Sequence, residues 1–124
     1  MTQAISVRRG IQSTTFIAAI NEIIELLKAR AKFRGMMTYA ELVSKMTTVQ
    51  LQPDSYALFE MLGEASIITY WAEGYMITAL VVHKVGDQEP GNGFFQLAKD
   101  LGETVIDQTL FWVEQVKKTH AANS

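Results

Sequence analysis

Apolar residues recur at three- and four-residue spacing in several parts of the chain, which is the pattern of amphipathic helices. In residues 13–34 the apolar positions are Phe16, Ile17, Ile20, Ile23, Ile24 and Leu27. Near the C-terminus the sequence predicts a final amphipathic helix that ends near His120. Its pattern is defined by Val105, Ile106, Thr109, Leu110, Val113 and Val116. Two more helices are expected over residues 54–73 and from Phe94 to Leu101.

A capping box predicts one further short helix over residues 39–46. The sequence Thr38-Tyr39-Ala40-Glu41 has the T-x-x-E spacing in which Thr38 accepts from the Glu41 amide and the Glu41 side chain returns the bond. Met37 and Leu42 are placed to form the matching hydrophobic staple.

Other polar and glycine residues indicate where the long helices begin and end. Ser13 or Thr14 can cap the first helix, and Asp54 can cap the third. Gly35 and Gly74 follow the first and third helices, where a left-handed residue is commonly needed.

Residues 77–85 are apolar at successive positions, which predicts a strand that is buried on both faces. Residues 86–91 have the composition of a loop. The glycines that follow precede a helix, so they can shape a turn that buries Phe94 and Phe95, or leave amides free to hold an anion. We favour the turn, because no P-loop lysine follows.

Together these elements predict a single α+β domain over residues 1–124, mostly helical and winged-helix-like, with a small sheet containing residues 77–85. Residues 1–12 are expected to form a loose arm or short strand with solvated arginines at Arg8 and Arg9, and residues 121–124 to fray. The chain has no cysteine, which fits a reducing cytoplasm, and no apolar run long enough to span a membrane.

The formal charge of −2 is distributed unevenly along the sequence. Residues 1–45 hold seven Lys/Arg and three Glu, for +4, whereas residues 46–124 hold four Lys/Arg and ten Asp/Glu, for −6. This asymmetry fits either a basic strip that faces a ligand or two halves that attract each other, and we favour the second.

The chain lacks the residue patterns that most enzyme classes use for catalysis. The two histidines, His83 and His120, belong to no metal-binding spacing, and the chain has neither a nucleophile elbow nor a cysteine. A nuclease pattern fails because Val82 stands where its second carboxylate is required. The remaining candidate is an acid–base cluster of His83, Asp87 and Glu89, and we expect no catalytic residue, metal or cofactor.

Two surfaces remain as candidates for binding a macromolecule. Acidic and aromatic residues could receive a basic protein, or the aromatic ones could belong to the core: Glu60, Glu64, Tyr70, Trp71, Glu73, Tyr75, Asp87 and Glu89. Four basic residues could contact DNA phosphates instead: Lys28, Lys32, Arg34 and Lys45. The helix that would read DNA in a winged-helix domain carries only acidic charges, which disfavours DNA.

Several motifs over residues 36–96 resemble a small module of uncharacterised bacterial and phage proteins. Thr38 to Leu42 is similar to its Y-x-E-L helix, and Thr78 to Lys84 with Pro90 to Phe94 is similar to its L-V-V-x-K and P-G-x-G-F signatures. The chain departs from the module at Tyr75-Met76, where prolines are usual. Members occur alone or beside nucleases in mobile-element and defence settings, so the resemblance implies an interaction role without catalytic residues.

From these observations we predict a non-enzymatic cytoplasmic protein-binding module. Its most concrete form is an immunity or antitoxin protein that inhibits a basic nuclease toxin, with acidic groups that mimic the toxin's phosphate substrate. The alternative is a winged-helix DNA-binding regulator, and the third possibility is an undetected hydrolase or nuclease.

Overall fold

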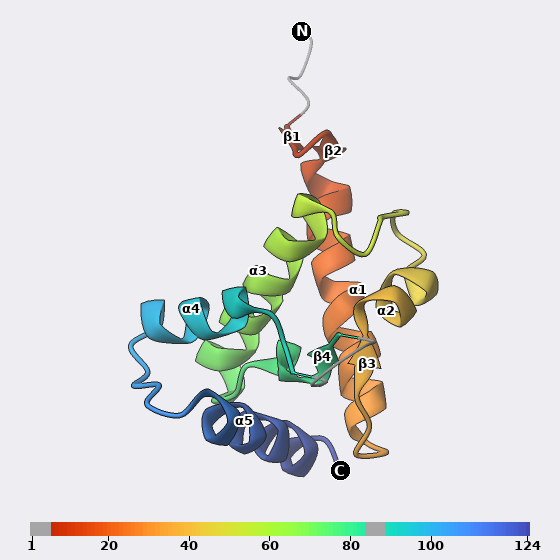
Figure 1. Ribbon diagram of the computed structural model, residues 1–124. Helices are drawn as coiled ribbons and strands as arrows, with labels where there is room; N and C mark the ends of the chain where they lie inside the picture. Colours follow the sequence, from red (N-terminus) through yellow and green to blue (C-terminus); the bar gives the residue numbers. More distant parts are fainter. Residues whose placement is uncertain (1–5, 84–88) are drawn as a thin grey trace, which may run out of the picture.

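The computed structural model describes residues 6–83 and 89–124 and has the mostly helical α+β fold that the sequence predicts (Figure 1). Its helices are α1 (Ser13–Ala31), α2 (Tyr39–Lys45), α3 (Tyr56–Glu73), the 3-10 helix η1 (Ile77–Leu80), α4 (Asn92–Asp100) and α5 (Gln108–Ala122). The strands are β1 (Val7–Arg8), β2 (Ile11–Gln12), β3 (Met37–Thr38) and β4 (Val81–Val82).

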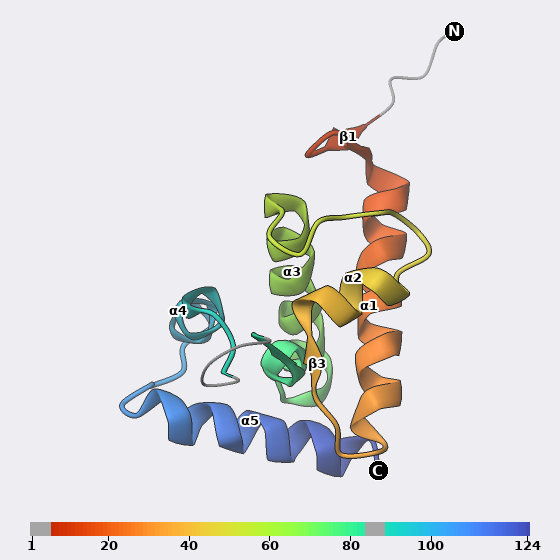
Figure 2. The ribbon, with the colours of Figure 1, turned by 45° about the vertical axis from the view of Figure 1, so that its right-hand side comes forward.

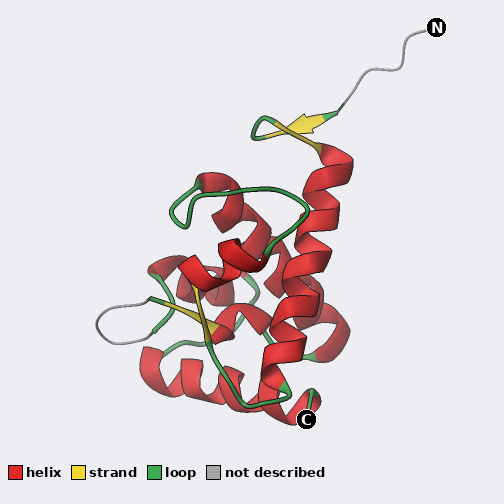
Figure 3. Ribbon diagram, turned by 90° about the vertical axis from the view of Figure 1, so that its right-hand side faces the viewer, coloured by secondary structure: helices red, strands yellow, loops and turns green. Residues whose placement is uncertain are grey.

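The short helix η1 lies at the centre of the molecule. Helices α1, α3 and α5 all contact it, and α1 and α3 also pack on each other. In Figure 2, α2 crosses in front of α1, α5 runs beneath the other helices, and α4 lies on the far side of α3 from α1. The β1–β2 hairpin stands at the N-terminal end of α1 (Figure 3).

The predicted strand at 77–85 is wrong over its first half. Residues 77–80 form η1, and only Val81–Val82 is a strand, which pairs in parallel with Met37–Thr38. Residues 84 and 85 lie outside the described part of the chain. The prediction failed because residues 75–82 are all buried, and continuous burial suits a short helix as well as a strand.

Side chains take the place of strand partners for the segment that leads into η1. The backbone N–H of Met76 donates to Gln115 Oε1 at 2.9 Å, and that of Ile77 donates to Thr69 Oγ1 at 3.1 Å. The N–H of Thr78 donates to Ser66 Oγ, also at 3.1 Å. Buried amides need acceptors, and these three side chains come from α3 and α5.

The capping box is confirmed in one of its two bonds. The Glu41 amide donates to Thr38 Oγ1 at 3.1 Å, as predicted. The Glu41 carboxylate, however, pairs with the Arg30 guanidinium of α1 instead of returning a bond to Thr38. A charged partner forms the stronger hydrogen bond, so the acid that should complete the cap joins α2 to α1.

The ends of the long helices differ from the prediction in three places. Ser55, not Asp54, caps α3 and accepts from the Leu58 amide at 3.2 Å. No side chain caps α1, where Gln12 holds the cap position at the end of the hairpin. After α1 the left-handed residue is Arg34, with φ of 54°. After α3 the prediction is confirmed, since Gly74 has φ of 87°.

Gly35 is required by a close approach instead of by a left-handed backbone. A Cβ atom at this position would lie 2.6 Å from Cδ of Arg30, which is closer than side chains tolerate. Arg30 uses that space to donate from Nη1 to the Met36 carbonyl at 2.6 Å. Glycine therefore lets the arginine that pairs with Glu41 close the α1–β3 turn.

The last helix, α5, matches the predicted apolar face only in part, since Val116 packs against the hydrophobic core but other residues are the fully buried ones. It begins at Gln108, after Val105 and Ile106, and its buried residues are Gln115 and Thr119. Leu110, expected on the apolar face, is 67% exposed. The tail expected to fray includes the last turn of α5, after which the Asn123 side chain donates to the Tyr75 hydroxyl at 3.0 Å.

The two oppositely charged halves of the sequence attract each other, as favoured above. Arg8 pairs with Glu60 at 2.8 Å and with Glu64 at 2.6 Å, Arg9 pairs with Glu60 at 2.9 Å, and Lys28 pairs with Glu73 at 2.8 Å. Arg8 and Arg9 remain accessible to solvent, with side chains 31% and 54% exposed, but they are ion-paired with α3, which the expectation of a loose arm did not include. The tight β1–β2 hairpin, whose turn has positive φ at Arg9 and Gly10, directs both side chains onto α3.

Glu22 on α1 holds the loop after α2 by accepting hydrogen bonds from the amides and hydroxyls of Thr47 and Thr48, at 2.6–3.1 Å. Partial burial raises the pKa of Glu22, but these bonds outweigh it and lower the pKa from 4.5 to about 2. Because the folded-state pKa is the lower one, the carboxylate stabilises the fold fully above the unfolded pKa. This contribution disappears as pH falls through about 2.

We therefore expect Glu22→Gln to lower the free energy of unfolding at neutral pH, with a difference from the wild type that shrinks between pH 4.5 and about 2. Urea unfolding at a series of pH values measures this difference. The control is Glu25→Gln, which changes an exposed carboxyl on the same helix. A difference that stays constant with pH would contradict the role assigned to the ionised carboxylate.

Candidate functional site

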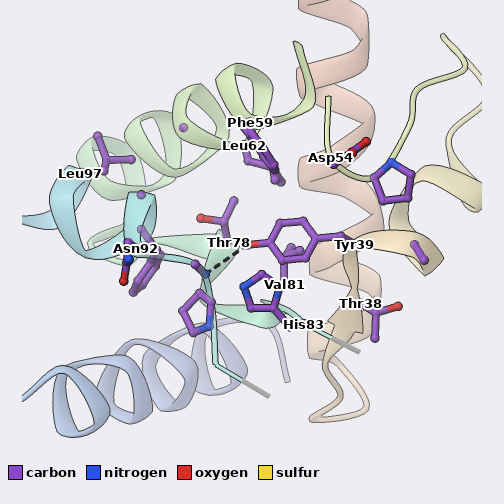
Figure 4. A pocket seen from close by; sticks show the side chains of 17 residues that line it. Thr38, Tyr39, Asp54, Phe59, Leu62, Thr78, Val81, His83, Asn92 and Leu97 are labelled. Atoms are coloured by element: carbon purple, nitrogen blue, oxygen red, sulfur yellow. Dashed lines mark hydrogen bonds between the residues drawn. The ribbon is translucent and has the colours of Figure 1, made fainter. Parts of the chain in front are cut away.

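A pocket of about 660 Å³ opens between α2, α3, β4 and the start of α4 (Figure 4). Its volume lies within the range of roughly 300–1,000 Å³ that small-molecule sites occupy. Seventeen residues line it: Thr38, Tyr39, Ala40, Pro53, Asp54, Phe59, Leu62, Gly63, Thr78, Val81, His83, Pro90, Gly91, Asn92, Gly93, Phe94 and Leu97.

The walls of this pocket are mainly apolar. Phe59 and Leu62 enter from α3, Val81 comes from β4, and Phe94 and Leu97 come from α4. The turn at Pro90–Gly93 buries Phe94 and Phe95, as the favoured interpretation of those glycines expects. The same turn brings the first residues of α4 to the edge of the pocket.

Tyr39, the first residue of α2, organises the polar side of the pocket. Its hydroxyl accepts a hydrogen bond from the Gly91 amide at 3.3 Å, drawn as the dashed line in Figure 4. Its ring lies 5.1 Å from the His83 ring and meets Phe59 edge-to-face at 6.3 Å. Burial raises the pKa of the Tyr39 phenol, and the Gly91 bond lowers it by less. The phenol therefore stays protonated at neutral pH and keeps a proton to donate.

Three of the four glutamates predicted to bind a partner lie on α3 and pair with cations of the same chain, whereas Glu89 lies before α4 and accepts from Thr109. Glu60 and Glu64 hold Arg8, and Glu73 holds Lys28. Their side chains remain between 34% and 36% exposed. The acidic part of the predicted surface is therefore accessible but largely neutralised from within.

The predicted aromatic patch divides between surface and core. Trp71 is 72% exposed, whereas Tyr75 is 1% exposed and lies in the core. Tyr70 is half-buried and meets Trp71 edge-to-face at 5.1 Å between ring centroids. Placing Tyr75 on a binding surface is wrong, because the chain turns inward immediately after Gly74.

The two described residues of the suspected acid–base cluster, His83 and Glu89, are not hydrogen-bonded to each other through their side chains. His83 is exposed and lies against Tyr39, and the Glu89 carboxylate accepts a hydrogen bond from the Thr109 hydroxyl at 2.7 Å. Asp87 lies outside the described residues. Glu89 and His83 are connected through the backbone, where the His83 amide donates to the Glu89 carbonyl at 3.4 Å.

The basic residues suggested for DNA are only partly free to act together. Lys28 is paired with Glu73 on α3, whereas Lys32, Arg34 and Lys45 are exposed. The α3 helix that follows them carries Glu60, Glu64 and Glu73 as its charged residues.

Sequence reasoning missed both the pocket and the full extent of the apolar surface on α3. Four large side chains are exposed on that helix: Tyr56 (76%), Phe59 (47%), Ile68 (46%) and Trp71 (72%). We call these four residues the outward face of α3. The signal that could have revealed this surface was the sequence of residues 56–73, in which apolar side chains occur on every side of the helix.

Among residues 6–83 and 89–124, no three potential metal-ligating side chains lie together. None of the helices described is both long and apolar enough to cross a membrane. The sequence matches no known protein-family model, no curated protein and no solved structure. The resemblance to the bacterial and phage module therefore stays a prediction from its motifs.

Proposed function

We propose that this chain is a non-enzymatic protein-binding module that meets its partner through the outward face of α3. The observation that carries this proposal is the exposure of Tyr56, Phe59, Ile68 and Trp71 on one helix. A helix that is apolar on all sides is normally covered on all sides. Among the described residues, α3 packs on α1, η1 and α4, and Arg8 and Arg9 of the hairpin reach its Glu60, Glu64 and Tyr56.

The residue types on this face also favour a protein as its occupant. Tryptophan and tyrosine are enriched among the residues that dominate binding energy at protein interfaces, because they bury large areas with few rotatable bonds. Trp71 meets the Tyr70 ring edge-to-face at 5.1 Å between ring centroids, so two aromatic side chains adjoin at this end of α3. The exposed indole is therefore the main anchor that we propose for the interface.

The partner that best complements this surface is a basic protein. Glu60, Glu64 and Glu73 lie on the same helix as the aromatic residues and keep about a third of their side-chain surface exposed. Arginines and lysines of a partner can share these carboxylates with Arg8, Arg9 and Lys28 or replace them. An immunity or antitoxin protein that inhibits a basic nuclease toxin is the most concrete form of this function.

Site-specific photo-crosslinking tests the proposal in cells that carry the gene in its natural setting. Benzoylphenylalanine at Ile68 should capture one basic protein, whereas the same group at the exposed Leu110 of α5 should not. Capture of only a second copy of the chain would replace the basic partner with self-association. Equal capture at both positions, or none at Ile68, would contradict binding through α3.

Nucleic-acid assays with the purified chain separate the proposal from its alternatives. A protein binder should cleave neither DNA nor RNA and should ignore duplex DNA at physiological salt. Tight duplex binding that weakens steeply with salt, and that is lost in Lys32→Glu and Arg34→Glu, would support the DNA-binding regulator instead. Cleavage abolished by His83→Ala would support the third possibility, an enzyme.

A further inference from the structure

We propose that the pocket beside Tyr39 binds a small aromatic molecule that carries a hydrogen-bond acceptor. This site shares Phe59 with the outward face of α3 but contains none of its other three residues, and its function goes beyond protein binding. Its residues come from six separate elements, β3, α2, α3, η1, β4 and α4, and from loops between them, so the fold as a whole forms it (Figure 4). Three observations support a ligand here: two glycines that keep it open, its aromatic lining and its polar groups.

The first observation is the pair of glycines, and one of them lies in the middle of α3. Gly63 lines the pocket, and its φ is not in the left-handed range that requires glycine. A Cβ atom there would meet no described atom within 4 Å, so no close approach by the described chain requires glycine either. Glycine in a helix interior costs about 0.5–1 kcal/mol relative to alanine. The structural benefit of Gly63 is therefore the space that it leaves in the pocket.

The second glycine lies on another element of the lining, in the first turn of α4. Gly93 also lines the pocket, has no positive φ, and offers a Cβ atom open space. Two different helices that line the same pocket thus each have a residue there without a side chain. Close approach of a ligand to the backbone is a recognised reason for glycine at such positions.

The shape and composition of the lining favour a flat ring. Tyr39 and Phe59 meet edge-to-face, and His83 lies 5.1 Å from the Tyr39 ring, so aromatic surfaces border one side of the pocket. Phe94 supplies a further aromatic side chain from α4. Aromatic rings prefer offset-stacked or edge-to-face neighbours, and this set of rings can provide both.

The site has hydrogen-bond donors among its few polar groups, so a ligand that binds there needs an acceptor. The Tyr39 hydroxyl oxygen already accepts from Gly91, and its proton meets no acceptor among the described residues. At the start of α4 no side chain caps the helix, since the cap residue is Gly91. The Phe94 amide donates to the Gly91 carbonyl at 3.1 Å, whereas the amides of Asn92 and Gly93, which also line the pocket, have no side-chain acceptor among the described residues. A carboxylate, sulfonate or carbonyl oxygen on the ring can accept from these donors.

The experiment uses anilinonaphthalene sulfonate, an aromatic probe with acceptor oxygens, and measures its fluorescence during titration of the full chain. We expect saturable binding to the folded wild type. Gly63→Leu should weaken it by about tenfold or more, because the leucine fills the pocket. Ala72→Leu places the same side chain at an exposed position of the same helix and should leave binding unchanged. Thermal melts establish that both variants are folded.

A second variant and a second probe make each outcome decisive. Gly93→Leu fills the pocket from α4 and should reproduce the loss if Gly63→Leu fails to fold. Decanoate has an acceptor but no ring, and it should bind more weakly than the aromatic probe. Stronger decanoate binding, wild-type affinity in both filled variants, or no binding of the aromatic probe would each overturn the proposal. Trp71→Ala should leave probe binding unchanged, so this site and the protein-binding surface can fail separately.

Discussion

Replacing Trp71 with alanine should weaken binding of the partner protein by about 2 kcal/mol or more, a loss of roughly 30-fold in affinity. The indole is 72% exposed in the free chain, so its removal costs little stability while it takes away the largest side chain of the outward face of α3. Truncation of a central tryptophan typically has effects of this size at protein interfaces.

Isothermal titration calorimetry between the purified chain and the partner captured at Ile68 measures the loss. Leu110→Ala is the matched control, because Leu110 is 67% exposed but lies on α5. Equal affinities of the Trp71→Ala variant and the wild type would rule out α3 as the centre of the interface. A basic partner adds a further expectation, namely that the association rate falls as salt rises.

Replacing Leu80 with alanine should lower the free energy of unfolding by about 2–5 kcal/mol. Leu80 is completely buried at the end of η1, in the core cluster that α1 and α3 share. Truncation removes apolar contacts and leaves a cavity that three packed helices cannot easily close, because α1, α3 and α5 all contact η1.

Urea unfolding followed by circular dichroism measures this change, and Leu110→Ala again provides the comparison. The same substitution at the exposed Leu110 should alter the free energy of unfolding by no more than about 0.5 kcal/mol. Similar losses for the two leucines would contradict the placement of η1 at the centre of the core and of Leu110 at the surface.

Much of the helical framework could be predicted because its signals act within a few residues. The Thr38 cap, the apolar periodicity of residues 13–34 and the left-handed Gly74 each depend on hydrogen bonds or backbone preferences inside one or two turns. Such signals place a helix correctly whatever its neighbours are. They failed at the start of α1, where the preceding hairpin, and not a side chain of Ser13 or Thr14, determines how the chain enters the helix.

The candidate sites were predicted less well, because exposure depends on contacts between distant residues. Leu110 and Gln115 both lie on α5, yet the leucine is exposed and the glutamine is buried. Gln115 is buried because the Met76 amide, 39 residues away, needs an acceptor in the core. Tyr75, assigned to a surface patch, is buried for a similar reason, since its hydroxyl contacts Glu73 and Asn123.

The sequence by itself determined that this chain is a mostly helical α+β protein and where most of its helices lie, and it favoured an attraction between the oppositely charged halves. Tertiary structure alone decided that residues 77–80 form a 3-10 turn, that Glu60, Glu64 and Glu73 receive cations of the same chain, and that Gly63 and Gly93 line one pocket. The physical reason is range: helix signals are local, whereas burial, ion pairing and cavities depend on packing between elements far apart in the sequence.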